Sequence, residues 1–347
     1  GLGILIAGEA TAPKVVHNPA ALANPTDVGA YSITALHHRL PPAALEEVQR
    51  YLDFFTTKQR RRIQDGLARS GRYQEAFRKI FHEEGIPEEL VYLPMIESGF
   101  VETAVSPAQA VGVWQFIEET GARYHLQRDS WSDRRLDPIG SARAAAQLLR
   151  NLYETFGNWD LALAAYNSGP GTVNWALKVN AKERRPIDYW DLDLPDETKN
   201  YVPAFIAMVL IAKNPSAFGF DEIQFHPKLV YDQLKVAPGV PLSELADSLG
   251  LDVDQLYELN PELIRGTVPP GNPYVVRIPA GSKARLLAQQ HFSPSLSPDY
   301  FVYPLKKEDS LQELATHFST RLASIQRINR IKDDGDLTLK RYLFIPL

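Results

Sequence analysis

Residues 93–101 read LPMIESGFV and hold one acidic residue, Glu97, in an otherwise apolar stretch. Apolar neighbours disfavour the charged form of a carboxyl group and raise its pKa, as a general acid working near neutral pH requires. A glutamate at the end of an apolar helix can also be a capping or surface residue, so this stretch alone leaves both interpretations open. The glutamate pairs at 83–84, 88–89 and 118–119 lie in polar surroundings and are typical of solvated helix faces.

Helical periodicity continues on both sides of this stretch. Apolar residues at steps of three and four, first-turn prolines and an Asn158 N-cap predict helices at 45–55, 73–81, 87–97, 113–125, 138–156, 158–167 and 195–213. Pro94 lies inside the third of these, so we expect a kink or an early end there. Residues 42–220 are therefore predicted to form one mainly α-helical domain, preceded by a loosely structured arm at residues 1–41.

An internal repeat follows Pro215, in which a set of residues matches the residues 69 positions later without a gap. The shared positions are apolar or asparagine, and they include Leu242 with Leu311, Ala246 with Ala315 and Asn260 with Asn329. Both copies close with a short segment that ends in Ile-Pro. A strand, two short helices and a returning strand form the simplest unit with this pattern, so residues 229–280 and 299–347 are predicted to form two small βααβ modules.

The composition excludes several classes of protein. With 347 residues, 44% of them hydrophobic, the chain is long and apolar enough for two or three folded units. The formal charge of −5 argues against a nucleic-acid partner, and the longest wholly apolar run, 205–212, is too short to span a membrane. The chain has no cysteine, its eight histidines form no metal-ligand pattern, and no nucleotide-binding or nucleophile-elbow motif occurs. We therefore expect no disulfide, no metal and no cofactor.

Three segments, in order and spacing, resemble the family 1 lytic transglycosylases, and most nearly their membrane-bound D type. They read ESGF at 97–100, SPAQAVGVWQF at 106–116 and AAYNSG at 164–169, with support from DPI at 137–139 and ETKNYVP at 197–203. The βααβ repeat resembles the LysM module, a small glycan-binding domain that follows the catalytic domain in this type. The resemblance implies a mainly α, lysozyme-like fold of the goose-type lysozyme or SLT class, followed by two small α+β LysM-like modules.

This family cleaves the β-1,4 bond between N-acetylmuramic acid and N-acetylglucosamine in peptidoglycan, so the resemblance implies that activity and that partner. It assigns Glu97 as the single catalytic acid and base. Ser106 falls on the serine that helps to position the muramoyl N-acetyl group. The substrate-binding set that the resemblance implies is Ser98, Ser106, Gln115, Tyr166 and Asn167.

Glycosidases usually work with two carboxylates, whereas this pattern offers one. We therefore expect protonated Glu97 to give its proton to the glycosidic oxygen while the neighbouring N-acetyl group stabilises the positive charge at C1. Glu97 would then take the proton of the muramoyl C6 hydroxyl, whose oxygen closes a 1,6-anhydro ring without consuming water. Tyr166 is expected to hold Glu97 in place through a hydrogen bond.

Two positions are not settled by the resemblance. Trp114 stands where some members have Met, and its indole is predicted either to stack on a sugar ring or to fill the core. Gln109 stands where the D type usually has Gly, so we expect the loop after Ser106 to have a different shape.

Two other functions remain as alternatives. A hydrolytic muramidase would need a second carboxylate, for which Glu102, Asp133 and Asp137 are candidates, whereas a non-catalytic peptidoglycan-binding protein would need none. Because peptidoglycan lies outside the cytoplasmic membrane, we expect the protein in the periplasm or on the envelope of a Gram-negative-type bacterium. The apolar stretch 2–8 reads like the end of a signal segment, which predicts export by an upstream signal.

Overall fold

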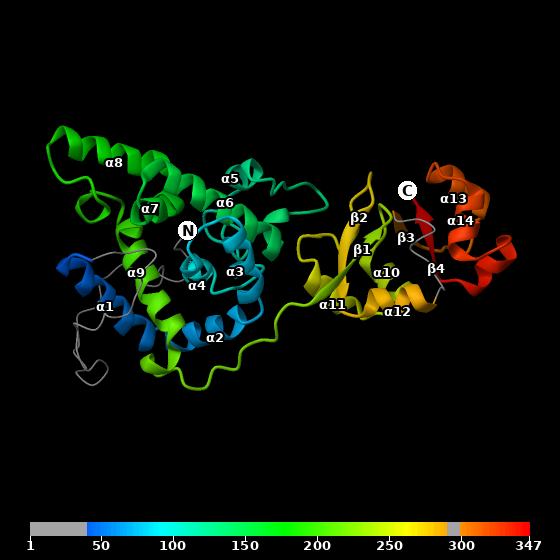
Figure 1. The fold of residues 1–347 in the computed structure, drawn as a ribbon, viewed down its shortest axis with the longest axis horizontal. Coiled ribbons are helices and arrows are strands. Elements are labelled where there is room, and N and C mark those ends of the chain that lie inside the picture. The colour runs from blue at the N-terminus through cyan, green and yellow to red at the C-terminus, as the bar shows by residue number, and fades with distance from the viewer. Residues whose placement is uncertain (1–39, 290–298) are drawn as a thin grey trace. The chain divides into compact units, whose positions relative to one another are not determined.

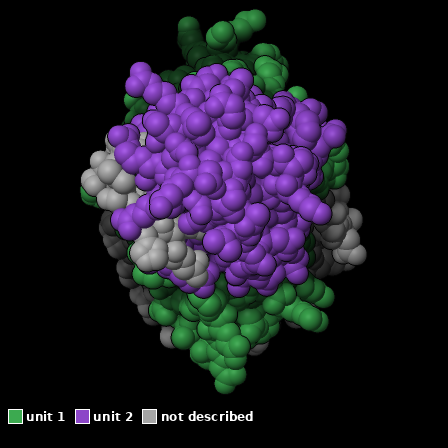
Figure 2. Space-filling view, turned by 90° about the vertical axis from the view of Figure 1, so that its right-hand side faces the viewer, with its two compact units in different colours: residues 1–127, 134–229 green, residues 128–133, 230–347 purple. Residues whose placement is uncertain are grey.

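The computed structural model describes residues 40–289 and 299–347 and divides the chain into two compact units, coloured separately in Figure 2. Unit 1 comprises the described residues up to Gln127 together with Arg134–Leu229, and unit 2 comprises Arg128–Asp133 and Val230–Leu347. Of the arm predicted for residues 1–41, all but the last two residues lie outside the described part of the chain. Each unit has a hydrophobic core of its own.

Unit 1 is built mainly from helices (Figure 1), as predicted for residues 42–220. Its α-helices are α1 (Pro42–Thr56), α2 (Arg60–Ser70), α3 (Gln74–Glu83), α4 (Leu93–Glu97), α5 (Glu118–Arg123), α6 (Pro138–Phe156), α7 (Trp159–Ser168), α8 (Pro170–Lys182) and α9 (Asp196–Lys213). Its 3₁₀ helices are η3 (Glu88–Tyr92), η4 (Arg134–Leu136), η5 (Tyr189–Asp191) and η6 (Pro215–Phe218).

Helix α9 is the central element of unit 1. It packs against α1, α4 and α7, and its residues 201–211 are all buried. A helix that is apolar on every side is stable only when other elements cover it, and this explains why the apolar run at 205–212 is a core helix. Among the described residues, no helix is both long and apolar enough to cross a membrane.

Helix start signals were read correctly at several places in unit 1. Helix α6 begins and ends where the sequence predicts, with the Asp137 side chain accepting from the Ile139 amide at 3.0 Å. The predicted Asn158 cap of α7 is confirmed, because its side chain accepts from the Leu161 amide at 3.1 Å. These starts were predictable because a capping side chain and an N-terminal proline act within one turn of sequence.

Two predicted helices were wrong in extent. The helix predicted at 87–97 is divided into η3 and the short α4, and Pro94 lies in the first turn of α4, where a missing amide costs no hydrogen bond. The helix predicted at 113–125 is confined to α5, because Val111 instead forms antiparallel bridges with Val105 and Phe116. Helices α2 and α8 were not predicted.

Unit 2 contains the two predicted βααβ modules. The first consists of β1 (Tyr231–Val236), α10 (Leu242–Leu249), α11 (Val253–Leu259) and β2 (Tyr274–Pro279). The second consists of β3 (Tyr300–Pro304), α13 (Leu311–His317), α14 (Leu322–Asn329), η8 (Asp334–Leu339) and β4 (Tyr342–Pro346). Helix α12 (Ser282–Gln289), which was not predicted, follows β2.

The two modules share one four-stranded sheet, which the repeat alone did not predict. Its strand order is β2-β1-β3-β4. Each module pairs its own strands antiparallel, and β1 joins β3 in parallel at Val236 and Val302. Strands β1 and β3 therefore pair with each other along one edge, which reduces the exposed strand edge of both modules.

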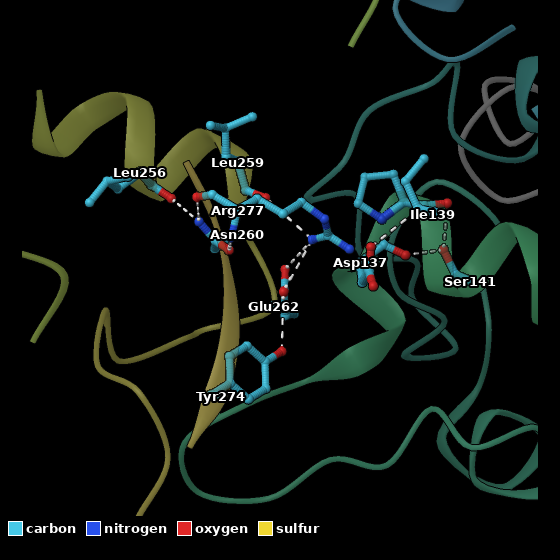
Figure 3. Close-up of polar contacts among 10 residues, drawn as sticks. Asp137, Ile139, Ser141, Leu256, Leu259, Asn260, Glu262, Tyr274 and Arg277 are labelled. Atoms are coloured by element: carbon cyan, nitrogen blue, oxygen red, sulfur yellow. Dashed lines mark hydrogen bonds and ion pairs between the residues drawn. The ribbon is translucent and has the colours of Figure 1, made fainter. Parts of the chain in front are cut away.

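Each module is closed by a buried asparagine at the end of its second helix. In the second module, the Asn329 amide group donates to the carbonyls of Ile325 and Phe344, and its Oδ1 accepts from the Phe344 amide. In the first module, Asn260 makes the same three bonds to Leu256 and Arg277 (Figure 3). This equivalence explains why the repeat retains an asparagine at this position.

Asn329→Ala should lower the free energy of unfolding of unit 2 by about 2 kcal/mol or more, because it leaves three buried backbone groups without partners. Hydrogen exchange of β4 amides measures this loss. Gln312→Ala, at an exposed position in the same module, is the control and should have little effect. Equal exchange in the two variants would show that the asparagine bonds do not hold the module closed.

Candidate active site

Glu97 is the last residue of α4 and is 1% exposed. Its burial raises the pKa of the carboxyl group, which favours the protonated form. The hydroxyl of Tyr201, on α9, donates to Oε1 at 2.5 Å and acts in the opposite direction on the pKa, with a smaller effect than burial. The other oxygen, Oε2, has no hydrogen-bond partner among the described residues. This carboxyl group can therefore carry a proton on Oε2, which bonds to no side chain among the described residues.

The backbone turns sharply after Glu97. Gly99 and Phe100 both have positive φ angles, 61° and 59°, so the chain reverses immediately beyond the helix. The hydroxyl of Ser98 donates to the carbonyl of Val113 at 2.8 Å. Ser98 therefore ties the end of α4 to the segment that contains Gln115.

Residues 104–116, which we call the cleft loop, contain two of the predicted substrate contacts. The loop closes on itself through the Gly112 amide, which donates to the Ala104 carbonyl at 2.8 Å. The Gln115 amide group donates to the carbonyls of Gly112 and Ala104, while its Oε1 has no partner among the described residues. Ser106 accepts from the Ala110 amide at 3.0 Å through its hydroxyl, which keeps its proton for a further bond. Both side chains thus shape the loop and keep hydrogen-bonding capacity.

The predicted hydrogen bond between Tyr166 and Glu97 was wrong. The Tyr166 hydroxyl donates instead to the carbonyl of Trp114 at 2.8 Å, and the partner of Glu97 is Tyr201. Burial and the nearby Glu97 raise the pKa of both tyrosines, so both remain protonated donors. Tyr201 lies within the quoted segment 197–203. Its contact with Glu97 joins residues more than a hundred positions apart, and no sequence periodicity predicts such a contact.

Asn167 contacts the start of α9. Its Oδ1 accepts from the Thr198 hydroxyl at 2.8 Å, and its amide group donates to Glu197 at 3.2 Å. Glu197 in turn contributes to the raised pKa of Glu97. The motif at 164–169 is thereby joined to the helix that holds Tyr201.

Trp114 fills the core. Its side chain is fully buried, and its ring packs against Phe77 and Phe81 with centroids 5.2 Å and 5.5 Å apart. Of the two roles predicted for this indole, the structure favours the core role over stacking on a sugar ring.

The three other candidate carboxylates are engaged elsewhere. Glu102 accepts from the Tyr73 hydroxyl, and its Oε1 lies 3.5 Å from Arg72 Nε. Asp137 caps α6. Asp133 belongs to unit 2, where its Oδ2 lies 3.8 Å from Arg128 Nε. In the described part of the chain, no group of three or more acidic or histidine side chains is arranged to hold a metal ion.

Protein-family models match most of the described elements. The model for the transglycosylase SLT domain matches residues 75–187. The model for the LysM-like domain of the lytic transglycosylase MltD matches residues 230–291, and the model for the LysM domain matches residues 303–346. Unit 1 therefore contains a helical, lysozyme-like SLT domain, and unit 2 contains two LysM-type modules.

Individual proteins and solved structures are similar to this chain over parts of its length. The membrane-bound lytic murein transglycosylase D of Escherichia coli strain K12 is 30% identical over 262 residues, which cover 72% of this chain and 58% of that protein. A putative tributyltin chloride resistance protein of Alteromonas sp. strain M-1 is 35% identical over 106 residues, 30% of this chain and 51% of that one. The solved 70 kDa soluble lytic transglycosylase of Escherichia coli is 22% identical, with a TM-score of 0.34, over 45% of this chain and 27% of that one.

The chain therefore has an SLT domain followed by two LysM-type modules, and over 72% of its length it is similar to a membrane-bound lytic murein transglycosylase D. It spans somewhat more than half the length of the curated relatives that it matches.

Tyr201→Phe should raise the pKa of Glu97 further, because the variant loses a hydrogen bond that favours the charged carboxylate. A carbon-13 NMR titration of the Glu97 carboxyl group measures the change. Tyr166→Phe is the matched control, because it removes a hydroxyl that bonds to Trp114 and should leave this pKa nearly unchanged. A shift in the control and none in Tyr201→Phe would reverse our assignment.

Glu97→Gln should stabilise the protein increasingly as pH rises. The pKa of Glu97 is raised by folding, so the stabilisation from its proton is complete below the unfolded pKa and is lost as pH rises through the folded pKa. The glutamine of the variant does not titrate, so its contribution to stability does not depend on pH. The Tm difference between variant and wild type should therefore begin to grow as pH rises above the unfolded pKa of a glutamate, about 4.3. A constant difference would mean that Glu97 has an ordinary pKa.

Proposed function

We propose that this protein is a lytic transglycosylase that cleaves the β-1,4 bond between N-acetylmuramic acid and N-acetylglucosamine in peptidoglycan. The observation that carries the proposal is the state of Glu97, a buried carboxyl group with a raised pKa and one oxygen without a partner among the described residues. The similarity to a membrane-bound lytic murein transglycosylase D supports the substrate class.

The proposed reaction uses Glu97 twice. The proton leaves Oε2 for the glycosidic oxygen as the C1–O bond breaks, and the muramoyl N-acetyl group stabilises the positive charge at C1. The carboxylate then removes the proton of the C6 hydroxyl, the C6 oxygen bonds to C1, and Glu97 is protonated again. The product is a 1,6-anhydromuramoyl end, and no water enters the balance. Tyr201 holds Oε1, so Oε2 is the oxygen that exchanges the proton.

The proposed substrate contacts are Ser98, Ser106, Gln115, Tyr166 and Asn167. The unpartnered Oε1 of Gln115 supports a contact to a sugar hydroxyl or amide, because a buried acceptor without a partner is costly unless a ligand supplies one. The Ser106 hydroxyl can donate a hydrogen bond to the N-acetyl carbonyl, because its own oxygen only accepts from Ala110. Ser98, Tyr166 and Asn167 would act mainly by fixing the segments around Glu97.

We propose the following division of labour along the chain. Residues 42–220 carry the catalysis, and the modules at 229–280 and 299–347 bind the glycan strands of peptidoglycan. The proposed location is the periplasm or the cell envelope, where this substrate lies. The match to a membrane-bound relative supports an envelope location.

The alternatives have less support. A hydrolytic muramidase would need Glu102, Asp133 or Asp137 to activate water, and each of these carboxylates already has a structural partner. A non-catalytic binding protein would not need a buried acid, whose retention costs stability. The structure of Glu97 therefore favours the transglycosylase.

Glu97→Gln should abolish clearing of peptidoglycan in a zymogram, because the amide cannot give or take the proton. Glu102→Gln is the matched control, five residues away, and should keep most of the activity, since Glu102 has only structural contacts. Loss of activity in both variants would favour the muramidase. Equal clearing by wild type and Glu97→Gln would exclude Glu97 as the catalyst.

A further inference from the structure

The cleft loop contains two residues in an unfavourable backbone conformation. Gln109 and Gln115 have φ angles of 59° and 51°, in the left-handed region that residues with a Cβ rarely adopt. The side chain of Gln109 is exposed, so its own packing does not offset this cost. Residues in such conformations persist where the surrounding structure holds them, and they cluster at functional sites.

Arg135, on η4, is the side chain that contacts the loop at these points. It is 2% exposed, and its Nη1 donates to two carbonyls, at 3.3 Å to Gln109 and at 3.1 Å to Phe116. Arg135 therefore holds Gln109, which is strained, and Phe116, which follows the strained Gln115 at the end of the loop. Hydrogen bonds from a charged donor are stronger than neutral ones, and a buried guanidinium needs them to offset its desolvation.

The backbone of Arg135 also fits the loop closely. A Cβ at Gly112 would overlap the Arg135 carbonyl oxygen, so the loop can pass Arg135 only because residue 112 is glycine. On the other side, Gly121 lies against the aliphatic part of the Arg135 side chain. Gly112 lies within the quoted segment 106–116, whereas Arg135 and Gly121 lie outside the motifs quoted for the family.

We propose that Arg135 is a positioning residue for the glycan-binding loop. Its Nη1 donates to the carbonyls of Gln109 and Phe116 and thereby keeps Gln109 in the left-handed conformation. This conformation fixes the loop so that Ser106 and Gln115 face the substrate. This inference rests on the proposed function for the identity of the ligand. It assigns no proton transfer to Arg135, whose effect is on the loop and not on Glu97.

The test is hydrogen exchange of the cleft loop in the full chain, measured in a Glu97→Gln background with and without a muramoyl tetrasaccharide. Arg135→Gln should speed exchange across residues 104–116 and raise the tetrasaccharide concentration that half-protects this loop by about tenfold. Because the readout is confined to the loop, binding of the sugar by the modules does not contribute. In enzyme with Glu97 intact, the alkaline limb of the pH–rate profile should not move.

The rescue by Gln109→Gly separates positioning from general stability. Glycine adopts the left-handed conformation without cost, so adding Gln109→Gly to Arg135→Gln should return the half-protecting concentration to within about threefold of the parent. Arg135→Lys, which keeps a charged donor one bond shorter, should lose less than Arg135→Gln. Arg143→Gln, which removes a surface guanidinium that pairs with Glu83, is the control and should leave the loop unchanged.

Three results would overturn the proposal. They are unchanged loop exchange in Arg135→Gln, no rescue by Gln109→Gly, and a parent loop that the tetrasaccharide does not protect. A wild-type enzyme that releases no 1,6-anhydro product would instead contradict the proposed function, while faster loop exchange in Arg135→Gln and its rescue by Gln109→Gly would still support positioning by Arg135.

Discussion

The burial of one carboxyl group against α9 is the constraint on which the site depends. Glu97 can be buried because α4 ends inside the core. Pro94 lies in the first turn of this short helix, and Gly99 reverses the chain just beyond its end. Tyr201 can reach Oε1 only from a helix that runs through the middle of the unit. The apolar character of α9 is thus required for the chemistry, since it supplies both the low-polarity surroundings and the tyrosine.

Burial of this kind costs stability, and the unit compensates with rigid packing around the site. Trp114 packs against Phe77 and Phe81, and its carbonyl accepts from Tyr166. Ser98 ties the end of α4 to Val113, next to this tryptophan. The side chains that the family resemblance assigns to the substrate thus also form the scaffold of the loop, so their loss should disturb shape as well as contact.

The sequence predicted the acid more securely than its surroundings. The apolar neighbours of Glu97 predicted its burial, but only the motifs at 106–116 and 164–169 singled it out as the acid. Helices α6 and α7 were predictable because capping acts within one turn. The partner of Glu97 was assigned to Tyr166 and is Tyr201, since both tyrosines lie in quoted motifs and only the fold decides which reaches the carboxyl group. The bridges of Val111 replaced a predicted helix because pairing with Val105 and Phe116 outweighs local propensity. In unit 2 the repeat predicted both modules, but a single pairing between Val236 and Val302, which joins their sheets, leaves no trace in the pattern.

The central claim is that Glu97 alone acts as acid and base and that no water takes part. Digestion of peptidoglycan in water enriched in oxygen-18, followed by mass spectrometry of the products, tests this most directly. The account predicts muramoyl ends that are lighter than the hydrolysis product by one water and contain no label. Heavier, reducible ends with one oxygen-18 at C1 would contradict it and would identify a muramidase.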